Sequence, residues 1–443
     1  MIHKTKILYT YRIEYIEYIV YRVYMYFDVV IIGGGIAGLY AARRIQQLAP
    51  NKRIVILEKS GKAGLGGRAG NEMFYGTELA IGAGVGRKHK DRLLLQLLKQ
   101  TKVHTSEFEA TRNYFMPFSP VDINKTVQRL RAEYRSNPRA YNSMQFKDFF
   151  IRVLGKAQYE QFVVTSGYTD YEHADVYETL YKYGMDDNTR GGWTAVHVPW
   201  HDLVAEMYAS IGKECFKFSC EVTGIDIKLK QNPQQFQVRI RNAAAPITCD
   251  KVVIATTISA TKRLLPAPAS VHAPAYNQIH GQPFLMVYAK FDKASSDILK
   301  PLVKTFTVVA NRLQKLIPMN PDKGVYMIAY TDNAHATALK GRLDNTRGNC
   351  DAYAKWVEEA LGIAGAGLHI IAIKSYYWSE GTHYYEPLIS DGKYASRAEF
   401  IRAVQTPCAG LVVVGEAVSR NQGWVEGALE SVDAVVTKGW LKE

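Results

Sequence analysis

Three glycine-rich turns and a few aromatic residues are the parts of this 443-residue chain whose types and spacing could do chemistry. The first turn, Gly33-x-Gly35-x-x-Gly38, follows an apolar run and opens a helical pattern. Glycines at this spacing allow a tight turn and a close approach of the backbone to a pyrophosphate, and the helix N-terminus offers unpaired N–H groups to the phosphates. The turn therefore predicts a dinucleotide site at Gly33, Gly35, Ile36, Ala37 and Gly38.

An acidic residue supports this interpretation. Glu58 lies 20 residues beyond Gly38, at the end of a second apolar run, and Lys59 follows it. A carboxylate in this place accepts hydrogen bonds from ribose hydroxyls. We therefore expect Glu58 and Lys59 at the nucleotide, and the alternative is a glycine-rich loop that binds no nucleotide.

The elements that must position these residues form a β-α-β unit. Phe27–Ile32 and Arg53–Leu57 are short β-branched runs typical of buried parallel strands, with a helical pattern between them. The pattern is helical and polar from 88 to about 189. Beyond it we predict a sheet region at 215–257, strands at 284–291, 306–310, 324–330 and 369–378, a helix at 351–361, and a final strand followed by a helix at 424–438.

Two more glycine-rich turns follow the second strand. Gly66-Gly67-Arg68 comes soon after Leu57-Glu58, and Gly82-Ala83-Gly84-Val85 comes next. This arrangement resembles the FAD-binding proteins of the monoamine oxidase, polyamine oxidase and protoporphyrinogen oxidase superfamily. In that family an LE…GGR stretch closes over the FAD diphosphate, and a nearby loop runs beside the flavin. The resemblance implies FAD contacts from Gly66, Gly67, Arg68, Gly82, Ala83, Gly84 and Val85.

Two later segments extend the resemblance. The strand at 220–225 is similar to the family strand whose valine, here Val222, pairs its backbone with the adenine edge. The C-terminal Gly415-Glu416 and Gly423-Trp424-Val425-Glu426-Gly427-Ala428 resemble the family's last signature. This implies FAD contacts from Gly415, Glu416, Trp424 and Val425. It also implies that the last helix points its N-terminus at the flavin, where its dipole stabilises the negative charge that develops on reduction.

Aromatic residues are expected on the reacting side of the flavin. In amine oxidases two rings sandwich the amine, and the resemblance gives one position to Trp424 and the other to Tyr384, beside His383. Trp378 opens the same segment and is expected at the cofactor. The alternative is that these aromatic side chains only pack at a domain interface.

Two departures from the family pattern bear on the reaction. The lysine that amine oxidases place near the flavin falls here on Phe284 or a neighbour, and Lys290 on the same run is expected at the surface. Covalent members link the flavin through a cysteine just before the cage tyrosine. Because the chain has no cysteine between Cys350 and Cys408, we expect FAD to be noncovalent.

Charge is distributed unevenly along the chain, which has a formal net charge of +13. Residues 87–156 hold 15 Lys and Arg and 6 Asp and Glu, whereas 160–187 hold seven acids and one lysine, interleaved with tyrosines. An acidic, aromatic rim would attract a cationic amine; the alternative is two solvated helix faces. We expect no nucleic-acid partner, because no binding module is recognisable, and no metal site.

These patterns together predict an α/β fold, with a Rossmann-like FAD-binding domain interleaved with a mixed α+β substrate domain. The expected FAD domain comprises 27–87, 190–279 and 405–443, the substrate domain comprises 88–189 and 280–404, and 1–26 is an extension outside the fold. The expected protein is a cytoplasmic enzyme without a membrane span. It moves hydride from a small substrate, possibly an amine, to flavin N5 and is reoxidised by O2.

Three alternatives stay open beside this interpretation. The first is a desaturase or protoporphyrinogen-oxidase-like enzyme that acts on C–C bonds. The second is a flavin-dependent mutase of the galactopyranose type. The third is a non-catalytic binding protein like the GDP-dissociation inhibitors. The substrate and the oligomeric state are not encoded in any pattern of the sequence.

Overall fold

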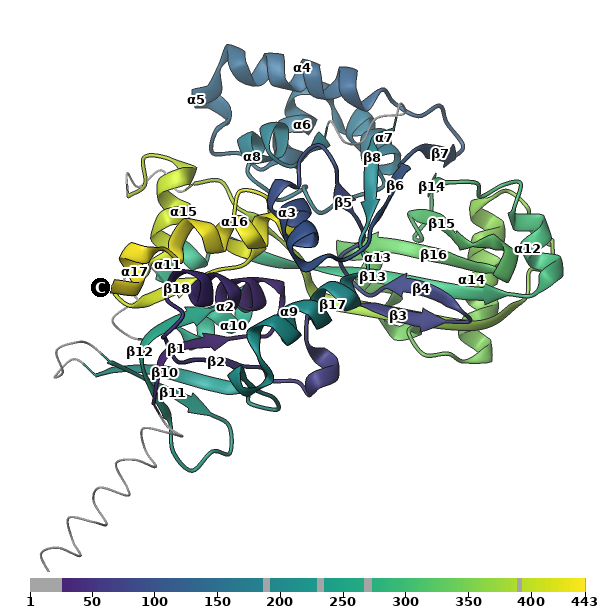
Figure 1. Cartoon of the computed structure of the whole chain (residues 1–443). Coiled ribbons are helices and arrows are strands. Elements are labelled where there is room, and N and C mark those ends of the chain that lie inside the picture. The colour runs from purple at the N-terminus through teal and green to yellow at the C-terminus, as the bar shows by residue number, and fades with distance from the viewer. Residues whose placement is uncertain (1–25, 186–191, 229–234, 267–272, 389–392, 443) are drawn as a thin grey trace, which may run out of the picture.

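The computed structural model describes residues 26–185, 192–228, 235–266, 273–388 and 393–442. The expected N-terminal extension lies outside these residues, except that Tyr26 is the first residue of strand β1 (Tyr26–Ile32). The molecule has two large sheets, each with its own hydrophobic core, and a lobe of short helices beside them (Figure 1).

The first sheet has a parallel centre, as the apolar runs in the sequence predict. Strand β1 pairs in parallel with β2 and β12, β2 pairs in parallel with β9, and β12 pairs in parallel with β18. Strands β10 and β11 extend the same sheet in antiparallel order. The strands that join β1 in this sheet are β2 (Ile54–Leu57), β9 (Phe216–Lys217), β10 (Val222–Lys228), β11 (Gln235–Ile240), β12 (Ile247–Ile254) and β18 (Leu411–Val413).

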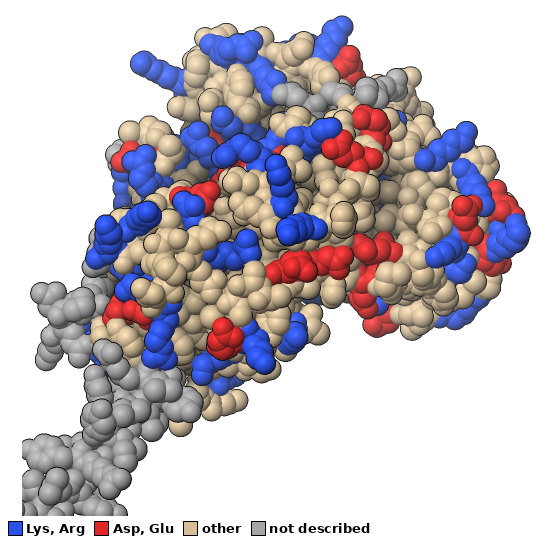
Figure 2. Space-filling model, in the orientation of Figure 1, with Lys and Arg blue, Asp and Glu red and all other residues tan. Residues whose placement is uncertain are grey.

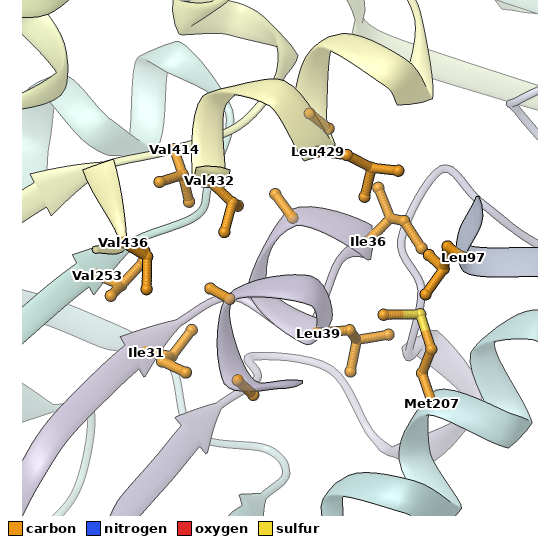
Figure 3. Packing of buried hydrophobic residues seen from close by; sticks show 14 of the residues in the cluster. Ile31, Ile36, Leu39, Leu97, Met207, Val253, Val414, Leu429, Val432 and Val436 are labelled. Atoms are coloured by element: carbon orange, nitrogen blue, oxygen red, sulfur yellow. The ribbon is translucent and has the colours of Figure 1, made fainter. Parts of the chain in front are cut away.

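Helix α2 (Ile36–Leu48) lies at the centre of the core on one face of this sheet. Figure 3 shows it surrounded by apolar side chains from β1 and from three other helices. The surrounding helices are α3 (Arg92–Thr101), α9 (Trp200–Ile211) and α16 (Val425–Val435). Segments from both ends of the chain therefore enclose the helix that opens at the first glycine turn.

The second sheet runs in the order β17-β13-β16-β15-β14-β7. Its strands are β7 (Arg112–Phe115), β13 (Ile279–Phe291), β14 (Phe306–Val309), β15 (Lys315–Asn320), β16 (Val325–Asp332) and β17 (Ile370–Tyr385). Helices α12 (Lys293–Leu299), α13 (Asn333–Leu339) and α14 (Arg347–Ala360) pack on one face. The hairpin of β3 (Asn71–Phe74) and β4 (Thr77–Ala80) lies against the other face, where Leu79 packs with Met286 and Tyr288.

The long strands β13 and β17 belong to both halves of the molecule. Ile279 and Tyr385 lie in a core shared with the first sheet, whereas Leu285 and Ile373 lie in the core of the second sheet. The two strands pair with each other from Ile279↔Tyr385 to Phe291↔Ile370. One antiparallel ladder thus connects the two cores, and the fold is α/β with a Rossmann-like domain interleaved with a mixed α+β domain.

A helical lobe completes the fold (top of Figure 1). Its helices are α4 (Ile123–Ser136), α5 (Pro138–Tyr141), α6 (Phe146–Leu154), α7 (Lys156–Ser166) and α8 (Val176–Tyr181). A small sheet orders β5 (Gly86–Arg87), β8 (Thr194–His197) and β6 (Ser106–Glu109). The remaining helices are α10 (Ile258–Leu264), α11 (Ala273–Tyr276), α15 (Arg397–Gln405) and α17 (Lys438–Lys442).

Candidate active site

The first glycine turn leaves bare backbone at the start of α2. A methyl group on Gly33 would lie 2.5 Å from the Ala255 carbonyl oxygen, and one on Gly38 would lie 2.0 Å from the Gly33 carbonyl oxygen. Glycine is therefore required there for close packing. Gly35, the N-cap of α2, has no such neighbour, and no side chain caps the helix. The first N–H groups of α2, including those of Ile36 and Ala37, are without a partner inside the helix, which suits an anionic group.

The second and third glycine turns lie against the first. Gly66 donates its N–H to the Gly34 carbonyl at 2.9 Å, and Ala83 donates its N–H to the Arg68 carbonyl at 2.8 Å. A methyl group on Gly82 would lie 2.4 Å from that same Arg68 carbonyl oxygen. The Gly66-Gly67-Arg68 turn and the Gly82–Val85 loop therefore form one continuous surface with the start of α2.

Glu58 lies at the C-terminal end of β2, beside the first turn. Its carboxylate accepts the N–H of Gly34 at 2.7 Å and the N–H of Ser60 at 2.8 Å, and the residue is buried. The Glu58 carbonyl accepts the N–H of Cys220 at 2.8 Å, which brings the start of β10 and Val222 next to this edge. Lys59 is exposed. The sequence-predicted nucleotide residues on β2 and β10 thus lie at one edge of the first sheet.

A buried carboxylate joins the second glycine turn to β17. Glu416 Oε1 lies 2.7 Å from Arg68 Nη1 and 2.5 Å from His383 Nδ1, and Glu416 Oε2 accepts the N–H of Gly423 at 2.9 Å. Burial by itself would raise the pKa of Glu416. The charge of Arg68 and the hydrogen bonds from His383 and Gly423 outweigh it and hold the pKa well below its usual range.

His383 has both ring nitrogens engaged. Its Nε2 accepts the N–H of Ile258 at 3.3 Å, so the ring proton lies on Nδ1 and is donated to Glu416. Arg68 also donates to the Gly381 carbonyl at 2.7 Å. The sequence predicts His383 as a catalytic residue; in the structure it contacts Glu416 and Ile258, and its catalytic role stays a prediction.

Trp424 precedes α16 and carries a buried guanidinium on its ring. Arg87 Cζ lies 3.7 Å from the ring centroid of Trp424, and Arg87 is 2% exposed. Asp91 holds the same guanidinium through Nε at 2.9 Å and Nη2 at 2.7 Å. Glu426, two residues beyond Trp424, accepts the N–H groups of Leu93 and Leu94 at the start of α3. Trp424 is therefore fixed between the starts of two helices.

The aromatic residues predicted on β17 separate into two places. Trp378 donates its indole N–H to the Ile81 carbonyl at 2.6 Å and so holds the loop that begins at Gly82. Tyr384 stacks on His280, with ring centroids 5.1 Å apart and planes at 22°. Among the described residues, Tyr384 and Trp424 make no ring contact with each other.

The family model for flavin-containing amine oxidoreductases matches residues 36–434, which is most of the chain and includes the second and third glycine turns and the C-terminal signature. The protein belongs to this family. It is an FAD-dependent oxidoreductase.

Solved structures of amine oxidases share the fold. Cyclohexylamine oxidase from Brevibacterium oxydans is 13% identical, with a TM-score of 0.73 over 94% of this chain and 99% of that chain. Wild-type putrescine oxidase bound to putrescine is 13% identical, with a TM-score of 0.71 over 93% of this chain and 98% of that chain. An uncharacterized protein of Acanthamoeba polyphaga mimivirus is 21% identical over 93% of both chains.

The glycine turns fit the flavin that this family binds. The nearest described atom would lie 3.9 Å from a methyl group on Gly35 and 3.8 Å from one on Gly67, and no described atom would lie within 4 Å of one on Gly84 or Gly415. Four glycines in four segments thus present backbone without side-chain cover. In an amine oxidoreductase this bare surface, together with the start of α2, would hold the dinucleotide.

The sequence did not predict a buried lysine that contacts two aromatic rings. Lys315 Nζ lies 3.4 Å from the ring centroid of Tyr168 and 4.6 Å from that of Tyr330, and it donates to the Gly167 carbonyl at 2.5 Å. Burial lowers the pKa of Lys315 to about 7, although the nearby carboxylates oppose the shift. Both rings lie next to Phe284, the residue at the expected lysine position.

No local pattern could have revealed Lys315 or Arg87. Lys315 opens a short strand, but Tyr168, whose ring centroid lies 3.4 Å from its ammonium, is distant in sequence, and Arg87 is one of several basic residues after the third turn. By contrast, the expected surface position of Lys290 agrees with its contact, a hydrogen bond to the Lys323 carbonyl at 2.6 Å. The positions of Lys315 and Arg87 depend on tertiary contacts.

In the ranges that the structure describes, no three His, Cys, Asp or Glu residues converge in a way that could hold a metal ion. No helix of the described chain combines the length and apolar character needed to cross a membrane.

Proposed function

We propose that the protein oxidises a small amine with noncovalently bound FAD and passes the electrons to O2. The observation that carries this proposal is the position of Trp424 at the start of α16, one residue after Gly423, whose N–H donates to the same carboxylate that binds Arg68 of the second glycine turn. The two similar structures whose titles name putrescine oxidase and cyclohexylamine oxidase support an amine as the substrate class.

In this proposal separate residues of the chain bind the cofactor, orient the substrate and exclude water. A bound flavin would supply the acceptor for the hydride that leaves the substrate carbon. Trp424 forms one wall of the substrate site, and Arg87 and Asp91 hold its ring in place. The turns at Gly33–Gly38, Gly66–Arg68 and Gly82–Val85 hold the cofactor, with Glu58 at the ribose.

The contacts around β17 support a noncovalent cofactor. Covalent members of the family use a cysteine just before the cage tyrosine, and here His383 precedes Tyr384. His383 is buried, and both of its ring nitrogens have partners in Glu416 and Ile258. Its nitrogens are therefore not available to form a bond to the flavin.

One observation favours a second candidate, oxidation of a C–C bond. Phe284 occupies the expected lysine position, is buried, and lies among the rings of Tyr168 and Tyr330. An apolar side chain there suits a substrate without a basic nitrogen. The two candidates predict different products, because only amine oxidation releases an amine-derived aldehyde or ketone.

The purified protein tests the proposal directly. We expect a flavin absorption spectrum, release of FAD into the supernatant on acid precipitation, and H2O2 production with a primary amine. A colourless protein that takes up no added FAD would refute the cofactor assignment. H2O2 production from a substrate that is oxidised at a C–C bond, with none from a panel of amines and diamines, would favour the second candidate.

A substitution tests the role of Trp424. We expect Trp424→Ala to lower kcat/KM roughly 10- to 100-fold, because the substrate loses a positioning wall, while FAD content stays unchanged. Trp356→Ala, on α14 in the second core, is the matched control and should leave kcat/KM of the folded protein near the wild-type value. Full turnover by Trp424→Ala would contradict the assignment.

A further inference from the structure

A cavity of about 660 Å³ opens between the helical lobe and the segment that leads into α15. Its volume is typical of small-molecule sites. The residues that line it lie outside the glycine turns. It is lined by Tyr134, Asn142, Asp175, Tyr177, Glu178, Leu388, Tyr394, Ala395, Ser396, Arg397 and Arg420.

Two opposite charges in the cavity form an ion pair through one nitrogen of a guanidinium. Arg397 Nη2 lies 3.1 Å from Asp175 Oδ2 and donates to the Glu386 carbonyl at 2.5 Å. Its guanidinium lies 4.8 Å from the ring of Tyr385 and 4.9 Å from the ring of Phe400. Asp175 also caps α8. This pair joins the lobe to α15, whereas Arg397 Nε and Nη1 are buried and have no hydrogen-bond partner among the described residues.

Glu178 is the unsatisfied acid of the cavity. It is 9% exposed, and its Oε1 has no hydrogen-bond partner among the described residues. Burial raises its pKa, and the charge of Asp175 adds to the effect, against Arg397, Arg420 and Lys182. A buried carboxylate oxygen without a partner is unfavourable, and a cationic ligand would relieve that cost.

Aromatic rings and one exposed arginine surround this acid. Tyr134 and Tyr177 have ring centroids 6.1 Å apart, and Tyr177 is 41% exposed. An ammonium group near such rings gains a cation–π interaction. Arg420 is exposed and makes no ion pair with any described acid, so its guanidinium is available for a carboxylate.

We propose that this cavity binds a small zwitterion of the amino-acid type, with its ammonium group at Glu178 and its carboxylate at Arg420. A simple cation would be opposed by Arg397, Arg420 and Lys182, and a simple anion by Asp175 and Glu178. A ligand that carries both charges matches Glu178 and Arg420, the acid and the base of the described lining that form no ion pair, whereas Arg397 and Asp175 pair with each other. The proposal is independent of the reaction proposed above.

Three ligands that share the same five-carbon alkyl chain test the proposal. Norleucine carries both charged groups, pentylamine lacks the carboxylate, and hexanoate lacks the ammonium. Each is titrated calorimetrically into the full-length protein under argon, with the cofactor kept reduced by dithionite so that no turnover occurs. We expect norleucine to bind roughly tenfold or more tightly than either analogue, because each charged contact is lost separately.

Variants assign the binding to this cavity. Glu178→Gln and Arg420→Gln should each weaken norleucine binding roughly tenfold or more, whereas Glu160→Gln and Arg402→Gln, which change exposed charges on α7 and α15, should not. Trp424→Ala should also leave it unchanged. Binding lost only in Trp424→Ala would place the ligand at the flavin instead. No norleucine binding, equal binding of pentylamine, or binding unchanged in both cavity variants would overturn the proposal.

Discussion

At the scale of single residues, the site depends on charges that are buried in pairs. Arg87 stacks on Trp424 and is held by Asp91, and Arg68 shares the carboxylate of Glu416 with His383. Each arrangement fixes a side chain that the sequence predicts at the cofactor. The partners Arg87 and Asp91 were not predicted, because a stacked cation leaves no spacing pattern in the sequence.

Substitution of Glu416 tests how much its contacts with Arg68 and His383 contribute to the free energy of unfolding. Glu416→Gln leaves Arg68 and His383 without their shared charge, and breaking a buried pair in this way costs about 3 kcal/mol. Because the pKa of Glu416 is lower in the folded protein than its ordinary value of 4.5, its stabilising effect is complete above that pH. The effect is lost as the pH falls through the folded-state pKa.

Urea unfolding of both proteins between pH 3 and pH 8 measures this difference. We expect the gap in unfolding free energy to be constant at neutral pH and to shrink at the acidic end of the range. Glu359→Gln, which changes an exposed acid on α14, is the control. A gap that grew as the pH fell would show that the sign of the pKa shift is wrong.

At the scale of elements, the contact between α16 and α3 determines how the site is assembled. Glu426 accepts the N–H groups of Leu93 and Leu94 at 2.8 and 2.9 Å, so a residue of the last signature caps a helix more than 300 residues earlier. The carboxylate also suits the positive end of the α3 dipole.

Replacement of Glu426 by glutamine tests this cap. The amide retains one acceptor oxygen, so one of the two N–H groups loses its partner, and we expect a loss of about 1 to 2 kcal/mol in unfolding free energy. Glu206→Gln, at an exposed site on α9, should change the midpoint little. Denaturation monitored by circular dichroism measures both, and equal stability of the two variants would contradict the cap.

The sequence predicted elements well where strong local patterns exist. The run at 27–32 corresponds to β1, and the strand predicted at 369–378 is the first part of β17, which continues to Tyr385. The helix predicted at 424–438 ends at Val435, and α17 follows separately. The short strands β6 and β7 were missed inside the predicted helical region, because their partners β8 and β14 are distant in sequence.

The same limit applies to the candidate site. The glycine turns could be predicted, because the spacing of their glycines is a local pattern, although the contact of Gly33 with Ala255 is distant in sequence. The surroundings of Tyr384 could not, because they depend on the register between β13 and β17, which places Tyr384 opposite His280. The roles of the predicted residues at the cofactor stay predictions.

At the scale of the whole molecule, the expected boundaries cut through continuous elements. The boundary at 279/280 falls inside β13, and that at 404/405 falls at the end of α15. These boundaries stay predictions. The basic segment 87–156 includes α4 and α5, and Figure 2 shows many Lys and Arg side chains over that part of the molecule.

The shared ladder of β13 and β17 predicts one cooperative unfolding transition. Because these strands contribute to the cores of both halves, neither half keeps an intact core when the other unfolds. Single-tryptophan variants that retain Trp440 or Trp356 report on the two cores, and their urea transitions should coincide. Two separate midpoints would contradict this expectation.

The position of β18 and α16 has a consequence for protein synthesis. These elements come from the last part of the chain, yet β18 pairs with β12 and α16 packs on α2 in the centre of the first core. A nascent chain on the ribosome therefore lacks a strand, a helix and the Glu426 cap until residues 411–435 have been translated. A stop codon shortly before Gly415 would spare the whole of the second sheet but would leave α2 without α16.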